Sequence, residues 1–189
     1  MGNWLGGVWD RLFGEQREVK LCIVGLDAAG KTTILHKMRF DEVMPTAPTI
    51  GVNTEDITVR NVSIKVFDLA GQEKMRKVWR HYYSSIEGII FVLDATRVDR
   101  IAEARDELMG LLANEEARAI PVLVFANKQD LPEAVRSAEM VELLGIAEHV
   151  NRKPMSLVRV QESSAVQDQG LLEGFEWIVD KIITLNIAR

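Results

Sequence analysis

One stretch near the start of the chain has the residue types and spacing for phosphate chemistry. Residues 25–32 read GLDAAGKT, the G-x-x-x-x-G-K-T pattern of a phosphate-binding loop, or P-loop. Glycines let successive backbone N–H groups turn toward a phosphate, and the dipole of a following helix adds positive potential. Lys31 would bring its charge to the β- and γ-phosphates, and the Thr32 hydroxyl would ligate Mg²⁺. The alternative is a plain glycine-containing turn, which would need neither the Lys nor the Thr.

Two further polar motifs follow apolar runs. The first reads DLAGQ over residues 68–72 and comes after the run 62–67. The second reads NKQD over residues 127–130 and comes after the run 121–126. Taken alone, the second motif could be an ordinary polar loop between a strand and a helix. The carboxyl ends of parallel strands meet at one edge of a sheet, so the P-loop and both motifs are expected to lie together.

The elements that must hold these motifs alternate along the chain. Short apolar runs predict strands at residues 19–24, 53–59, 62–67, 88–93, 121–126 and 157–160. Helical periodicity predicts helices at residues 33–39, 99–112, 137–144 and 171–185. Ser137 is a candidate N-cap for the helix at 137–144, and Gly145 would end that helix. Residues 60–61 would form a tight turn between the second and third strands. The pattern predicts an α/β fold with a doubly wound, mostly parallel, six-stranded sheet flanked by helices.

The first residues differ from the rest. An apolar stripe at helical period is formed by Trp4, Leu5, Val8, Trp9, Leu12 and Phe13. We divide the chain into an amphipathic, membrane-interacting helix at residues 2–16 and a nucleotide-binding domain at 17–189. An ordinary core helix is the alternative to an interfacial one. Gly2 could accept a myristoyl group, although Gly6 stands where the acylation motif has Ser or Thr.

Composition excludes several classes of protein. The 189 residues carry a net charge of −5 and no long basic block, which argues against nucleic acid as the main partner. The single cysteine, Cys22, allows no disulfide within the chain and fits a reducing compartment. No apolar run approaches the length of a membrane span, and the first residues lack the features of a secretion signal.

Taken together, these motifs resemble those of the small GTPases. An Asp carboxylate, as at Asp130, can accept hydrogen bonds from both the ring N–H and the exocyclic amine of guanine, and adenine offers no such pair. The resemblance implies a nucleotide-binding set that comprises Asp27, Ala28, Ala29, Gly30, Lys31, Thr32, Thr33, Thr49, Gly71, Asn127, Lys128, Asp130, Ser164 and Ala165.

Within the small GTPases the chain is similar to the Arf and Arf-like (ADP-ribosylation factor) branch over nearly its whole length. The similar stretches include residues 25–35, 48–51, 79–83, 124–132 and 170–174. The chain also ends without the cysteine that Ras- and Rab-like relatives prenylate, so a lipid is expected on Gly2 instead.

The resemblance also implies roles. GTP or GDP would be the ligand and Mg²⁺ the metal, held by Thr32 and Thr49 directly and by Asp68 through water. Lys31 and Gln72 would be the catalytic residues: Lys31 stabilises charge on the transferred phosphoryl group, and Gln72 orients the attacking water. The Gly71 N–H would bond the γ-phosphate. Asn127 would contact the guanine edge, Lys128 would pack along the nucleotide, and the Ala165 N–H would meet the guanine oxygen.

The expected function is a GTP/GDP switch in membrane trafficking that hydrolyses GTP slowly and recruits effectors. Its partners would be an exchange factor, an activating protein, effectors and a membrane surface. It would be cytoplasmic and reversibly bound to endomembranes, the Golgi first among them. The resemblance further implies that the second and third strands, roughly residues 52–67, slide by two residues on GTP binding and thereby expel the N-terminal helix. The alternatives are a GTP-holding scaffold with negligible hydrolysis and a P-loop kinase.

Three residues depart from the family pattern: Ala70, Val52 and Phe67. These departures leave the choice of effector open.

Overall fold

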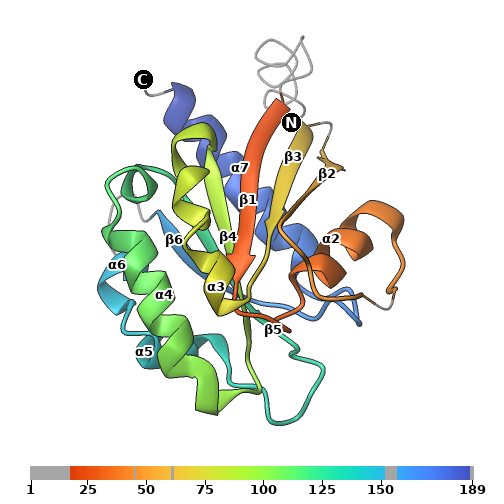
Figure 1. Ribbon diagram of the computed structural model, residues 1–189, viewed down its shortest axis with the longest axis vertical. Coiled ribbons are helices and arrows are strands. Elements are labelled where there is room, and N and C mark those ends of the chain that lie inside the picture. The colour runs from red at the N-terminus through yellow and green to blue at the C-terminus, as the bar shows by residue number, and fades with distance from the viewer. Residues whose placement is uncertain (1–17, 45, 61, 152–156, 188–189) are drawn as a thin grey trace, which may run out of the picture.

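A six-stranded sheet forms the centre of the molecule (Figure 1). The computed structural model describes residues 18–44, 46–60, 62–151 and 157–187. The strands are β1 (Glu18–Gly25), β2 (Val52–Val59), β3 (Val62–Leu69), β4 (Gly88–Asp94), β5 (Val122–Asn127) and β6 (Val158–Glu162). Their order in the sheet is β2-β3-β1-β4-β5-β6, and only β2 runs antiparallel to its neighbour. This confirms the expected mostly parallel sheet.

Helices cover both faces of the sheet. The α-helices are α2 (Lys31–Phe40), α3 (Glu73–Arg76), α4 (Ile101–Ala113), α5 (Ser137–Leu143), α6 (Ala147–Asn151) and α7 (Leu171–Ile187). Short 3-10 turns are η1 (Trp79–His81), η2 (Tyr83–Ser85), η3 (Val98–Arg100) and η4 (Ala117–Ala119). Buried side chains of α2 and α7 pack on one face of the sheet, and those of α4 and α5 pack on the other. None of the described helices is long and apolar enough to cross a membrane.

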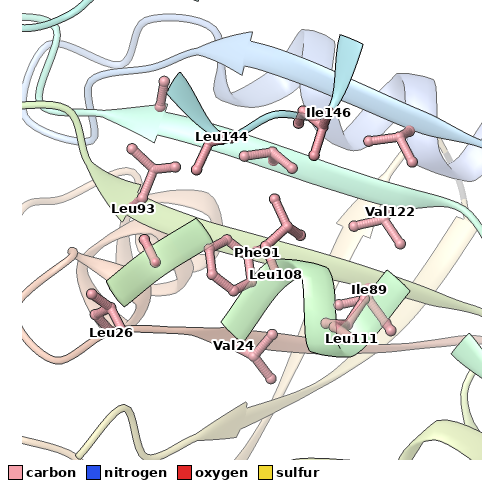
Figure 2. Packing of buried hydrophobic residues seen from close by; sticks show 14 of the residues in the cluster. Val24, Leu26, Ile89, Phe91, Leu93, Leu108, Leu111, Val122, Leu144 and Ile146 are labelled. Atoms are coloured by element: carbon pink, nitrogen blue, oxygen red, sulfur yellow. The ribbon is translucent and has the colours of Figure 1, made fainter. Parts of the chain in front are cut away.

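Alternation along the strands supplies two cores. In β4, Ile89 and Phe91 face α4, while Ile90 and Val92 face the α7 side. Figure 2 shows Leu108 and Leu111 of α4 lying over this first set. Burying each such side chain stabilises the fold by about 2 kcal/mol relative to exposure. Because both faces of the sheet are buried, the central strands read as continuous apolar runs, which is why they were predictable.

Three local expectations have clear outcomes. The hairpin β2–β3 forms, with Val59 opposite Val62 and Arg60 in the left-handed conformation. Gly145 ends the α5 region with a positive φ of 66°, as expected. The expected cap at Ser137 is wrong: Ser137 is the first residue of α5, and its N–H donates to the Glu162 carboxylate at 2.8 Å. The predicted helix at 2–16, and Gly2 with it, lies outside the described residues.

Candidate functional site

The P-loop connects the end of β1 to the start of α2. Ala28 and Gly30 both have positive φ, and Gly30 precedes the first residue of the helix. The Lys31 ammonium lies inside the curve of the loop, where it donates to the carbonyls of Gly25 at 3.0 Å and Leu26 at 2.9 Å. Burial lowers the pKa of Lys31 to about 8, against the opposing effect of Asp68 and Asp27. The cation is therefore positioned by the backbone of the loop.

Gly71 is the second residue after the end of β3, and it lies directly against the P-loop. A Cβ at this position would be 2.5 Å from both the Gly25 carbonyl oxygen and Lys31 Nζ, and 2.6 Å from Asp27 N. No larger residue fits without displacing one of these groups. The close approach places the backbone of Gly71 and the side chain of Lys31 at the same end of the site.

Three oxygen ligands converge beside Lys31. The Thr32 hydroxyl donates to Asp68 Oδ2 at 2.7 Å and lies 3.0 Å from the Thr49 hydroxyl. The Thr49 hydroxyl donates to the same Asp68 oxygen at 3.2 Å. They come from α2, the loop before β2, and the carboxyl end of β3. The fold thus brings Thr32 and Asp68, which are 36 residues apart in sequence, together with Thr49 into one cluster of oxygens.

Asp68 is the least satisfied group in this cluster. Its Oδ1 is buried with no hydrogen-bond partner among the described residues. Burial raises the pKa of Asp68, against the hydrogen bonds from Thr32 and Thr49 and the charge of Lys31. A buried carboxylate with a free oxygen and two neighbouring hydroxyls is a donor set suited to a hard cation such as Mg²⁺. The residues present therefore fit the metal that the P-loop pattern implies.

A cavity of about 360 Å³ is lined by Lys31, Thr32 and Thr49; Asp68, to which both hydroxyls are bonded, is not part of its lining. Its lining comes from the P-loop, α2, the loop before β2 and the start of the segment after β3: Asp27, Ala28, Gly30, Lys31, Thr32, Thr33, Thr46, Ala47, Pro48, Thr49, Gly71 and Gln72. Gln72 is exposed at the rim, in extended conformation immediately before α3. The cavity thus gathers the expected phosphate, metal and water-positioning residues in one place.

The second motif lies at the carboxyl end of β5 and is tied to the P-loop. Asn127 donates to the Ala29 carbonyl at 2.9 Å and accepts from the Ala165 N–H at 3.3 Å. Asp130 accepts from the Ser164 hydroxyl at 2.6 Å. Asn127 therefore holds three loops together from within the protein, a role that the resemblance did not suggest.

Lys128 points toward a carboxylate that the sequence analysis overlooked. Its ammonium lies 2.6 Å from Asp94 Oδ2, at the end of β4. Burial would raise the pKa of Asp94, but the bonds from Lys128 and Thr96 hold it below its usual value. Asp94 pairs with Asn127 in the strand register. Its position after a buried strand, the same signal that identified Asp68, could have revealed it.

Two arginines near the P-loop were also missed. Arg76 of α3 is buried and donates to the Gly71 carbonyl at 2.9 Å. Arg100, at the end of η3, bonds the Asp27 side chain at 3.0 Å. Neither stands in a recognisable motif, and the P-loop residue that both approach, Asp27, is far from them in sequence, so spacing offers no signal for this contact.

Val52 and Phe67, which depart from the family pattern, both pack against the core cluster that lies under α4. Phe67 and Tyr82 contact each other with ring centroids 5.6 Å apart. Val52 is likewise partly buried against the same core cluster. The loop before β2 is mostly exposed, and Ile50 is 91% exposed at its end. Residues 46–49 of this loop also line the phosphate cavity.

Comparison with known proteins agrees with this geometry. The ADP-ribosylation factor family matches residues 5–182 of the chain. Among solved structures, the Arl6 BBS3 small GTPase from Trypanosoma brucei, with the bound nucleotide analogue GppNp, superposes with a TM-score of 0.80. It is 30% identical in sequence, and the match covers 89% of this chain and 99% of that one.

Proposed function

The chain belongs to the ADP-ribosylation factor family of small GTPases, and from that premise we propose that it is a GTP/GDP-regulated switch. It binds GTP with Mg²⁺, hydrolyses it slowly to GDP and phosphate, and presents a different surface in each state. Exchange factors, activating proteins and effectors are the partners that such a cycle requires.

The observation that carries the proposal is the hydrogen bond between Asn127 and the Ala29 carbonyl, 2.9 Å long. It fixes the motif suited to reading guanine against the loop suited to holding phosphates. A nucleotide that satisfied both would place its base near Asp130 and its phosphates near Lys31. A P-loop kinase would not need the hydrogen bond between Asn127 and Ala29, because its phosphate-binding loop does not have to be joined to a guanine-reading motif.

The mechanism is positioning and electrostatics, since phosphoryl transfer asks little covalent chemistry of the protein. Thr32 and Thr49 would hold Mg²⁺ directly and Asp68 would hold it through water, and the metal would neutralise charge on the phosphates. Lys31 contributes a fixed cation on the same side. Gln72, exposed at the rim of the cavity, orients the attacking water. The N–H of Gly71 would bond the terminal phosphate; the support is that the backbone of Gly71 packs closely on the P-loop.

We also propose that the switch acts at membranes. The support comes from the sequence: residues 2–16 carry an apolar stripe, and Gly2 could accept a myristoyl group. Both features lie in a segment outside the described residues. GTP binding would release the stripe for insertion, and GDP would return it to the domain. Reversible attachment to endomembranes such as the Golgi, in vesicle and protein transport, follows from a cycle of this kind.

The test of base recognition is Asp130→Asn. Loss of a charged, two-pronged hydrogen bond should weaken GTP binding by about 2 to 3 kcal/mol, roughly a hundredfold. Xanthosine triphosphate should bind the variant better than GTP does, because its added carbonyl can pair with the new amide. Equilibrium competition with a fluorescent nucleotide measures both affinities.

The matched control is Glu133→Gln, an exposed carboxylate three residues further along the chain, which should leave both affinities unchanged. If ATP competes with GTP at equal concentration on the unmutated protein, guanine recognition by this loop is disproved.

A further inference from the structure

The P-loop carries one negative residue, Asp27, among the residues that line the phosphate cavity. Asp27 lines the cavity, and its side chain is 47% exposed. Its backbone N and the Lys31 ammonium both approach Gly71, so Asp27 stands at the Lys31 end. Since Lys31 serves the β- and γ-phosphates, a carboxylate at this end opposes the charge of the ligand. Something must offset this repulsion.

Arg100 supplies the offset. Its guanidinium donates to Asp27 Oδ1 at 3.0 Å and to the Asp27 backbone carbonyl at 3.3 Å. The bond from Arg100 holds the pKa of Asp27 below its usual value, against a smaller opposing effect of burial. Arg76 adds a second guanidinium, 3.7 Å from the same carboxylate oxygen. Asp27 therefore faces two cations on the side of α3 and α4.

Helix α4 fixes both cations in place. Glu103 accepts from Arg100 at 2.9 Å through one oxygen and pairs with Arg76 at 2.8 Å through the other. Glu107, one turn later, accepts from Arg76 at 3.1 Å. Arg76 is 5% exposed and Arg100 22%, so neither can swing freely into solvent. Both guanidinium groups are therefore held in place beside Asp27, which is the only carboxylate among P-loop residues 25–32.

We propose that Arg100, backed by Arg76, sets the preference of the site for GTP over GDP by neutralising Asp27 and holding its carboxylate toward α4. This inference rests on the proposed function. The third phosphate of GTP brings additional negative charge into the cavity end that Asp27 lines. GDP lacks that phosphate, so an unpaired Asp27 would penalise GTP more strongly.

The experiment compares the affinities of the full-length protein for GDP and for GppNp, both with Mg²⁺. Arg100→Gln should lower the ratio of GppNp to GDP affinity by about tenfold at low salt, since two charges this close interact strongly at a partly buried site. The loss should shrink at high salt, because Asp27 is half exposed. Asp27→Asn in the Arg100→Gln background should restore the ratio.

Arg105→Gln is the matched control. Arg105 lies on α4, which begins directly after Arg100, but its partner is the exposed Asp106. This variant should keep the wild-type ratio. Asp27→Asn alone keeps both arginines and should raise the ratio several-fold, which tests the proposal even if Arg100→Gln does not fold.

The outcomes separate the two claims. If the unmutated protein binds neither nucleotide, the proposed function fails. If it binds both, while Arg100→Gln and Asp27→Asn each leave the ratio unchanged, only the role of Arg100 is overturned. A fall in both affinities by the same factor, without rescue by Asp27→Asn, would also overturn it, since it would indicate a structural role alone.

Discussion

Asp68 shows how a single residue can be unfavourable for the fold and suited to a ligand. Its carboxyl group is buried, and one oxygen has no partner among the described residues. Leaving a buried acceptor unsatisfied costs about 1 to 3 kcal/mol, and a charged one costs more. The fold retains this cost beside the hydroxyls of Thr32 and Thr49, where a divalent cation would remove it.

A prediction follows for Asp68→Asn. In EDTA the variant should be more stable than the unmutated protein by about 1 kcal/mol, raising Tm by roughly 2 to 4 °C, because the buried charge is gone. With Mg²⁺ and nucleotide the order should reverse, since the amide is a poorer cation ligand. Thermal unfolding in both conditions measures this, and a lower Tm in EDTA would contradict it.

The pH dependence of Asp68 has a definite sign. The folded state raises its pKa, so the folded state binds the proton more tightly than the unfolded chain does. In EDTA, the contribution of this group to stability therefore increases as pH falls through the raised pKa, and it is complete below the unfolded value. Protonation also competes with Mg²⁺, so affinity for the metal should begin to fall at a higher pH than for an ordinary Asp.

Residues with their own motif could be located from the sequence. The P-loop pattern places Lys31 and Thr32, and the rule of polar residues after strands places Asp68 and Asn127. Arg76 and Arg100 could not be found, because each acts only through partners on other elements. Asn127 was found, but its bond to the Ala29 carbonyl could not be, since it depends on how two loops approach one another.

At the scale of elements, secondary structure could be predicted where burial is uniform. The central strands and α4 agree with the expected runs within a few residues. The segment after Gln72 shows no clean period in the sequence because it folds as α3 and two 3-10 turns. Trp79 and Tyr83 of those turns nevertheless enter the core. The cap at α5 was wrong because Glu162, from a distant strand, satisfies the N–H of Ser137.

The hairpin β2–β3 is held at its tip by α7. Arg60 forms two bonds of 2.6 Å to the Glu176 carboxylate, and Asp180 lies 3.5 Å from the same guanidinium. A slide of two residues would move Arg60 by about 6.6 Å, enough to break this fork. The proposed strand slide would therefore exchange these contacts for others, and the fork favours the register seen here.

The N-terminal segment is the element for which membrane binding can be tested. Replacing Trp4 and Trp9 with Ala removes much of the apolar surface that the stripe would insert. Vesicle flotation of the acylated protein should show weaker binding of this variant in the GTP state, with its GTP affinity in solution unchanged. A single myristoyl chain alone binds only reversibly, with a constant of about 10⁴ M⁻¹.

Nucleotide dependence is the second readout of that experiment. The unmutated acylated protein loaded with a GTP analogue should float with the vesicles more than the GDP form does. Equal flotation of the two forms would mean that residues 2–16 are a static element and would remove the membrane part of the proposal.

At the scale of the whole molecule, topology explains why the site could be anticipated. Strands β1, β3, β4 and β5 are parallel, so the loops that follow them meet at one edge of the sheet. Three motifs spread over about a hundred residues of sequence therefore lie at the same edge of the sheet, and two of them line the phosphate cavity. Topology does not determine the ion-pair network beside the phosphate cavity, in which Arg76 and Arg100 neutralise the carboxylate of Asp27.

The central claim, a GTP switch with its own slow hydrolysis, is tested most directly by single-turnover phosphate release from bound GTP with Mg²⁺. We predict a rate on the order of 10⁻⁴ s⁻¹ or slower for the pure protein, because no arginine finger is supplied. Gln72→Leu should be at least about tenfold slower, since the water would lose its orienting group. The control Glu73→Gln, beside it and also exposed, should keep the unmutated rate. Equal rates for the unmutated protein and Gln72→Leu would contradict the switch and leave a GTP-holding scaffold.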